Sequence, residues 1–166
     1  MNNNDILIRI RYALDIKDAN MIEIFKLGGV EVTKEEVQMM LTKSTDGDIA
    51  ENEGNIKCTN RMLDSFLNGL IIFKRGQQDP TPEQPKRPEL SIKNNESVNN
   101  VVLKKLKIAL ALTSEDMLDI LKEAGVIITK GELGAVLRKE GQKNYKECGD
   151  RYARNFLKGL AIKYRI

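Results

Sequence analysis

Apolar residues recur along this chain at the three- and four-residue spacing of amphipathic helices, and no segment shows a convincing strand-like alternation. In the first such segment, about residues 5–14, the apolar positions are Ile6, Leu7, Ile10, Ala13 and Leu14. A second helix is predicted to start near Asp18 and to end at Gly28 and Gly29, because glycine is typical of the position just after a helix. The pattern predicts an all-α protein.

The same pattern occurs twice in the chain. Residues 4–43 align with residues 100–139 at a constant offset of 96, and residues 58–75 align with residues 148–165 at an offset of 90. Such a duplication is typical of a protein built from homologous units that pack together. We therefore expect two four-helix repeats related by a pseudo-twofold axis.

Features shared by both copies predict how each repeat is built. A threonine, Thr33 or Thr129, is followed three residues later by glutamate, which is the capping box that opens a helix. The fourth predicted helix follows a cysteine and contains a glycine, Gly69 or Gly159. Glycine weakens a helix interior by about 1 kcal/mol relative to alanine, so its presence in both copies predicts that another helix lies too close for a side chain.

The domain boundaries follow from composition. Residues 1–76 are predicted to form the first repeat and residues 98–166 the second. Residues 77–97 between them are polar and contain the four prolines of the chain, which is typical of an extended linker. A linker of this length permits the repeats to pack within one chain or to exchange between two chains, so monomer and homodimer both stay open.

Charge is distributed unevenly between the repeats. The chain carries 27 basic and 24 acidic residues, but residues 98–166 alone carry 14 basic and 8 acidic ones, a net charge of +6. No apolar run is long enough to span a bilayer and the N-terminus lacks a signal-peptide pattern, so we expect a soluble cytoplasmic protein. In that reducing compartment the two cysteines are expected to stay free thiols.

Motifs that would indicate an enzyme are absent from the sequence. The chain has no histidine, the commonest general base and metal ligand, and none of the common nucleotide, hydrolase or zinc-binding motifs. Asp46 and Asp48 have the spacing of the first EF-hand ligands, but Lys57 stands where a bidentate glutamate is required. Cys58 and Cys148 precede predicted helices, where a thiol pKa can be lowered, but packing of a small residue there is the favoured interpretation. We expect no catalytic residue, cofactor or metal.

The second and third predicted helices of each copy are joined by a glycine turn, as in a DNA-binding helix-turn-helix. Base-contacting helices usually carry a dense set of Arg, Lys, Asn or Gln residues. The outward positions of the third helix include Glu35 and Gly134 instead. Packing of a plain helical hairpin is therefore favoured.

One charged surface is patterned. At about 100° per residue, four cations of the last predicted helix fall within an arc of about 60°, opposite its apolar residues. With basic and aromatic residues just upstream they form a candidate binding face, which consists of Arg138, Lys139, Lys143, Tyr145, Lys146, Arg151, Arg154, Lys158 and Arg165. The first copy lacks this stripe, because Asp64 and Asn68 stand at two of the four positions. Such a face binds phosphates or an acidic protein, or is simply solvated.

Several segments resemble a known family. They are residues 68–76 (NGLIIFKRG), 99–110 (NNVVLKKLKIAL), 114–121 (SEDMLDIL) and 142–161 (QKNYKECGDRYARNFLKGLA). On these segments the chain resembles the YehS-like bacterial family of unknown function over nearly its whole length outside the linker. The resemblance implies a duplicated all-helical fold and a bacterial cytoplasmic protein, and it brings no established activity or site residues. The family pattern commonly has histidine where this chain has Gln142, which argues against a mechanism that rests on histidine there.

These features predict a non-enzymatic cytosolic module for macromolecular interaction or regulation, whose partner is a protein or another acidic surface. The alternative is a nucleic-acid-binding protein that uses the basic face of the second repeat. The two hypotheses differ in whether binding depends on a phosphate backbone, and therefore in how steeply it falls with salt.

Overall fold

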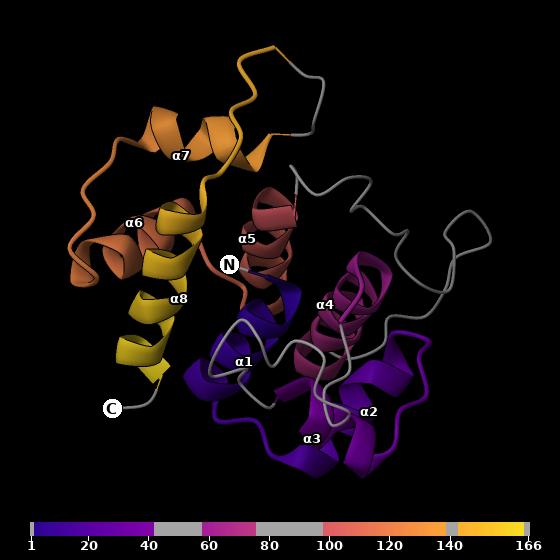
Figure 1. The fold of residues 1–166 in the computed structure, drawn as a ribbon. Helices are drawn as coiled ribbons and strands as arrows, with labels where there is room; N and C mark the ends of the chain where they lie inside the picture. Colours follow the sequence, from indigo (N-terminus) through magenta and orange to yellow (C-terminus); the bar gives the residue numbers. More distant parts are fainter. Residues whose placement is uncertain (1, 42–57, 76–97, 139–142, 165–166) are drawn as a thin grey trace, which may run out of the picture.

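The computed structural model describes residues 2–41, 58–75, 98–138 and 143–164, and these form eight α-helices without a strand (Figure 1). The first repeat contributes α1 (Asn3–Leu14), α2 (Asp18–Leu27), α3 (Lys34–Leu41) and α4 (Asn60–Arg75). The second contributes α5 (Val98–Ala109), α6 (Ser114–Glu123), α7 (Lys130–Leu137) and α8 (Asp150–Tyr164). The predicted all-α, duplicated architecture is confirmed. None of these described helices is both long and apolar enough to cross a membrane.

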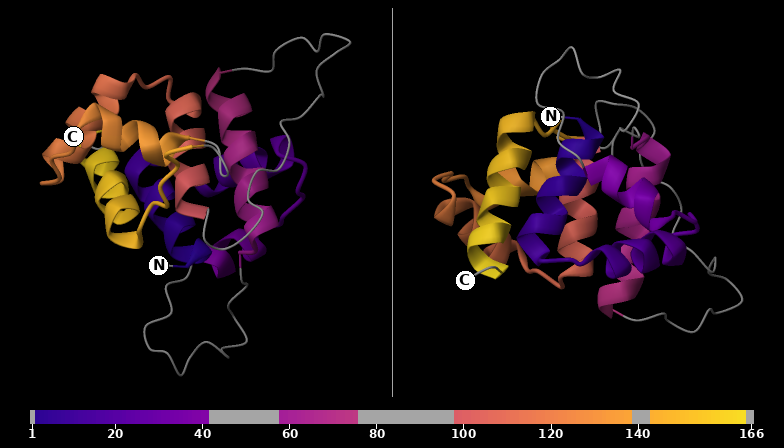
Figure 2. Two further views of the ribbon diagram at one scale, coloured as in Figure 1. Left: turned by 90° about the horizontal axis from the view of Figure 1, so that it is seen from above. Right: turned by 60° about the horizontal axis from the view of Figure 1, so that its bottom comes forward.

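Helices from both repeats form a central four-helix bundle. α1 contacts α8 and α4, and α5 contacts α4 and α8, so the four helices form a ring. The contacts of α1 with α8 and of α5 with α4 are the more extensive, and both join helices of different repeats (Figure 2). In the repeat alignment α1 corresponds to α5 and α4 corresponds to α8. The contact of α1 with α8 is therefore the counterpart of the contact of α5 with α4, and the bundle has pseudo-twofold symmetry. α2 and α3 pack beside α4 and α1, and α6 and α7 pack beside α8 and α5.

One apolar core extends through both repeats. Its largest fully buried side chains include Phe25 and Phe66 from the first repeat and Phe156 from the second. The rings of Phe25 and Phe66 lie 5.0 Å apart between centroids, which joins α2 to α4. Because α1 and α5 bury residues in the same core, neither repeat closes its apolar surface alone.

The predicted capping residues begin the third helix of each repeat. The Glu36 amide donates to the Thr33 hydroxyl at 3.1 Å, and the Thr33 amide donates to the Glu36 carboxylate at 3.0 Å. In the second repeat the Glu132 amide donates to the Thr129 hydroxyl at 3.1 Å, but the Glu132 carboxylate accepts from that hydroxyl instead of a backbone amide. At the third helix, therefore, both residues of the capping box bind a backbone amide only in the first repeat.

The second helix of each repeat ends before glycine, as predicted. α2 is followed by Gly28 and by Gly29, which has a φ of 99°, and α6 is followed after one residue by Gly125, which has a φ of 89°. These angles lie in the left-handed region, where residues with a Cβ are strained.

The glycines inside α4 and α8 lie against the backbone of a neighbouring helix. A Cβ added at Gly69 would lie 1.8 Å from the carbonyl oxygen of Ile24 in α2, and one added at Gly159 would lie 2.1 Å from that of Ile120 in α6. Real Cβ atoms do not approach so closely. The close helix approach predicted from the repeated glycine is confirmed in both repeats.

An asparagine at the start of each repeat joins three of its helices. The Asn4 side chain accepts from the Cys58 amide at 2.9 Å, and the Asn100 side chain accepts from the Cys148 amide at 2.8 Å. Each asparagine also donates to a carbonyl in the last turn of α3 or α7, at 3.0 and 2.9 Å. Neither asparagine belongs to a motif that predicts these hydrogen bonds, and their recurrence at equivalent positions is the one signal for them in the sequence.

Some predictions fall on parts of the chain that lie outside the described residues. They concern the linker at residues 77–97, the acidic loop with Asp46, Asp48 and Lys57, and the single residues Lys139, Gln142 and Arg165. These predictions stay as they were made from the sequence.

Candidate functional site

The predicted binding face lies along α8 and the segment that precedes it. Its exposed cations in the described part of the chain are Arg138, Lys143, Lys146, Arg151, Arg154 and Lys158. Tyr145 of the same face is half-buried. The Arg138 guanidinium donates to the Lys143 carbonyl at 2.8 Å, which connects the end of α7 to the segment before α8.

Three cations form a ridge on α8. At about 100° per residue, Arg151, Arg154 and Lys158 fall within an arc of about 60°, and we call this surface the cationic ridge. Arg151 also lines a hollow of about 510 Å³ beside the start of α8, whereas Lys158 lines a groove of about 340 Å³ between α1 and α8. The cationic ridge therefore separates two concave surfaces.

The groove between α1 and α8 combines cations with an apolar wall. Its lining residues are Asp5, Ile8, Arg9, Tyr12, Leu157, Lys158 and Ala161. Arg9 and Lys158 are exposed, and neither has a hydrogen bond or ion pair with a described residue. Arg154 is exposed on the same side of α8, one turn before Lys158. Asp5 is held in the capping box of α1, where its amide and carboxylate both bind Asn2.

The symmetry-related contact between α4 and α5 contains a buried ion pair. The Lys105 ammonium donates to the carboxylate of Asp64 and to the side-chain oxygen of Asn68. All three residues are buried. Burial lowers the pKa of Lys105, and the hydrogen bond to Asp64 opposes this shift. Since Lys105 belongs to the second repeat and its partners to the first, the cluster joins the repeats.

The two contacts are equivalent in position and different in charge. By the repeat offsets, the residues that correspond to Lys105, Asp64 and Asn68 are Arg9, Arg154 and Lys158. One contact therefore buries a cation with a carboxylate and an amide, whereas the other has three cations. Like charges are not buried together, because their desolvation and repulsion are uncompensated, so these cations stay in solvent and the groove stays open. Arg154 and Lys158 were predicted from the sequence, whereas Arg9 was not, and its signal is its alignment with Lys105.

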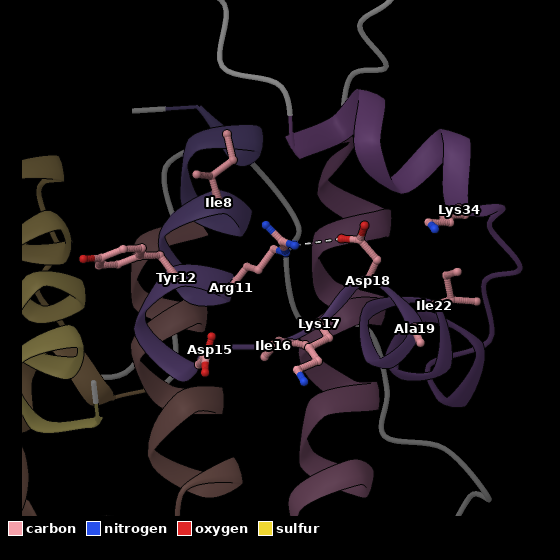
Figure 3. A pocket seen from close by; sticks show the side chains of 10 residues that line it. All are labelled: Ile8, Arg11, Tyr12, Asp15, Ile16, Lys17, Asp18, Ala19, Ile22 and Lys34. Carbon is pink, nitrogen blue, oxygen red and sulfur yellow. Dashed lines mark hydrogen bonds and ion pairs between the residues drawn. The ribbon is translucent and has the colours of Figure 1, made fainter. Parts of the chain in front are cut away.

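A second hollow borders the same part of α1 (Figure 3). It has a volume of about 680 Å³ and is lined by residues of α1, α2, α3 and the turn between α1 and α2. Arg11 and Asp18 form an ion pair of 2.8 Å across it, and Arg11 Nε is buried without a hydrogen-bond partner in the described structure. Tyr12 is 60 % exposed, lines both this hollow and the groove, and points toward α8. The hollow differs from the groove in that one of its cations, Arg11, is already paired with a carboxylate of its own lining.

The cysteines are buried and weakly acidic. Cys58 is 0 % exposed and Cys148 is 2 % exposed, and both are free thiols. Burial raises the pKa of each thiol to about 12, which is the opposite of what a reactive nucleophile needs. The packing interpretation of the cysteines therefore agrees with their surroundings. Among the described residues, no three Cys, Asp or Glu side chains gather closely enough to hold a metal ion.

The comparisons with known proteins agree with the duplicated helical architecture. Residues 3–76 and 99–165 match the family described as "Protein of unknown function (DUF1456)". The chain belongs to this family. It is 39% identical over 166 residues to the "Uncharacterized protein YehS" of Escherichia coli (strain K12). The aligned residues make up 100% of this chain and 98% of that protein. No solved structure matches the chain. The two matched segments of the DUF1456 family correspond to the two repeats, and the resemblance seen in the sequence is confirmed.

Proposed function

We propose that this protein is a non-enzymatic, cytosolic interaction module that binds an acidic protein through the cationic ridge of α8. The observation that supports the proposal is the contrast between the repeats. In α4 the corresponding side chains of Asp64 and Asn68 are buried against α5, whereas in α8 Arg154 and Lys158 are exposed. Packing explains the residues of α4. Burial does not account for the exposed cations of α8, although Arg154 helps to lower the pKa of Asp150 one turn earlier. This supports a contact of these cations with a group outside the fold.

The surroundings of the ridge favour a protein over a nucleic acid as the partner. Protein interfaces combine charged groups with apolar contacts, and the ridge lies between two concave surfaces that include apolar side chains. From Arg151 to Lys158 the ridge spans only about 10 Å of helix. Tight binding to a nucleic acid usually needs a longer array of phosphate contacts, which would have to include Arg138, Lys143 and Lys146 as well.

A comparison of charge-reversal variants tests the proposal. The variant Arg151→Glu/Arg154→Glu reverses two ridge charges, and Lys104→Glu/Lys122→Glu makes the same change in charge at exposed positions of α5 and α6. Each immobilised protein is incubated with native cytosol, with and without nuclease, and the retained proteins are quantified. We expect the wild type and the α5/α6 variant to retain the same acidic proteins, and the ridge variant to lose them, irrespective of nuclease.

Two results would contradict the proposal. Retention that disappears on nuclease treatment would show that the partner is a nucleic acid, as in the alternative from the sequence. Equal retention by the two charge-reversal variants would show that the ridge is only a solvated helix face.

A further inference from the structure

We infer that the groove between α1 and α8 is a binding site for a carboxylate of a partner protein, which lies between Arg9 and Arg154 with Lys158 beside it. The inference rests on the proposed function, because both require an acidic protein. It goes further in naming the chemical group that is bound. It also assigns part of the site to the first repeat, through Arg9.

The buried cluster on the opposite side of the bundle is the template for this site. There, one carboxylate and one amide oxygen surround the Lys105 ammonium between two helices of different repeats. The pseudo-twofold axis places α1 and α8 in the same relation as α5 and α4. The contact between α1 and α8 carries only cations at the equivalent positions. A carboxylate from outside would therefore supply the negative charge that Asp64 supplies in the template.

Arginine suits this role. A guanidinium donates two parallel hydrogen bonds to a carboxylate, and such charge-assisted bonds are about twice as strong as neutral ones. Arg9 and Arg154 project from different helices, so one carboxylate between them is approached from two sides. The template position of Arg9 is occupied by lysine, which acts as a point charge, whereas the open groove carries arginine, which recognises the planar group.

The wall of the groove indicates an acidic residue with apolar neighbours. Ile8, Leu157 and Ala161 line the groove beside the cations. A volume of about 340 Å³ holds a few side chains rather than a nucleic-acid strand. Asp5 lies in the same lining, where its carboxylate accepts a hydrogen bond from the Asn2 amide. Its charge opposes any anion, and it opposes a run of phosphates more than a single carboxylate. The expected ligand is thus a protein segment with one Asp or Glu flanked by aliphatic residues.

Selection from a display library of random 12-residue peptides on the intact protein tests the inference without knowledge of the partner. We expect the enriched peptides to carry an acidic residue beside aliphatic ones. Arg9→Glu should weaken the Kd of these peptides at least about tenfold, whereas Lys122→Glu, with the same change in charge on α6, should leave it unchanged. Replacing the acidic residue of the peptide with its amide should weaken binding to the wild type, and much less to Arg9→Glu.

The outcomes separate this inference from the proposed function. If the peptides are acidic and depend on Arg151 but not on Arg9, the groove inference is wrong and the ridge proposal stands. If the enriched peptides lack acidic residues, both are wrong.

A second experiment introduces a carboxylate of the chain itself beside the groove. Arg154→Asp introduces at this position the residue that repeat 1 has at its equivalent, while Arg154→Asn introduces the same shape without charge. We expect the Tm of Arg154→Asp to exceed that of Arg154→Asn by about 2–4 °C, because the carboxylate pairs with Arg9. Arg154→Asp should also abolish binding of the selected peptides. A Tm of Arg154→Asp equal to or below that of Arg154→Asn would show that the groove does not accept a carboxylate.

Discussion

At the scale of single residues, the two buried thiols make stability depend on pH in a definable way. Burial raises the pKa of Cys58 and Cys148 from 9.0 to about 12, so each keeps its proton in the folded state and loses it on unfolding above about pH 9. The free energy of unfolding should therefore fall as pH rises from 9 toward 12, by up to about 1.4 kcal/mol per pH unit for each thiol. Urea denaturation of the wild type and of Cys58→Ala/Cys148→Ala measures this. We expect a flatter pH dependence in the variant, and parallel curves would contradict the assignment.

The buried ion pair between the repeats gives a second prediction at this scale. Asp64→Leu leaves the Lys105 ammonium buried without its carboxylate, so the free energy of unfolding should fall by about 3–5 kcal/mol. Adding Lys105→Met removes the uncompensated charge as well, and should restore most of that loss. Chemical denaturation of the two single variants and the double variant forms a double-mutant cycle. Additive effects would show that the ammonium and carboxylate do not depend on each other.

At the scale of elements, the glycines of α4 and α8 set how closely helices pack. Gly159→Ala would place a Cβ against the Ile120 carbonyl, so α8 and α6 must move apart, which should lower the free energy of unfolding by about 1–3 kcal/mol. Gly134→Ala in α7 is the matched control, because a Cβ there meets nothing within 4 Å. That substitution should raise stability by up to about 1 kcal/mol through helix propensity. Thermal unfolding of both variants distinguishes the clash of the added Cβ with the neighbouring backbone from the effect of helix propensity. A Gly159→Ala variant more stable than the wild type would contradict the close approach of α8 and α6.

At the scale of the whole molecule, we expect each repeat to depend on the other for its stability. A fragment of residues 1–78 exposes the face of α4 that packs on α5, and it leaves Asp64 without Lys105. A unit of that length also buries a small share of its surface. We expect the isolated fragment to be loosely folded or self-associated when its circular dichroism is followed on heating. Cooperative unfolding at the midpoint of the intact protein would show instead that the repeat folds independently.

The sequence by itself determined the helices and their duplication. The apolar spacing, the threonine caps and the glycines after α2 and α6 act through contacts within a few residues, so the chain shows them directly. Gly69 and Gly159 extended this to two equivalent tertiary contacts, because a residue unfavourable in a helix was present in both copies. The cations of the candidate face were predicted for the same reason, since the 3.6-residue period of a helix places Arg151, Arg154 and Lys158 on one side.

Only the tertiary structure decided which of the equivalent charged positions are buried. Lys105 and Asp64 are 41 residues apart in the sequence and meet only because α5 packs on α4, so each by itself has the pattern of a solvated residue. Arg9 was missed for the same reason, because its importance depends on its place opposite α8. Local pattern determines which side of a helix is polar, whereas the helix that packs against that side determines whether its charges are paired, and the second depends on the whole fold.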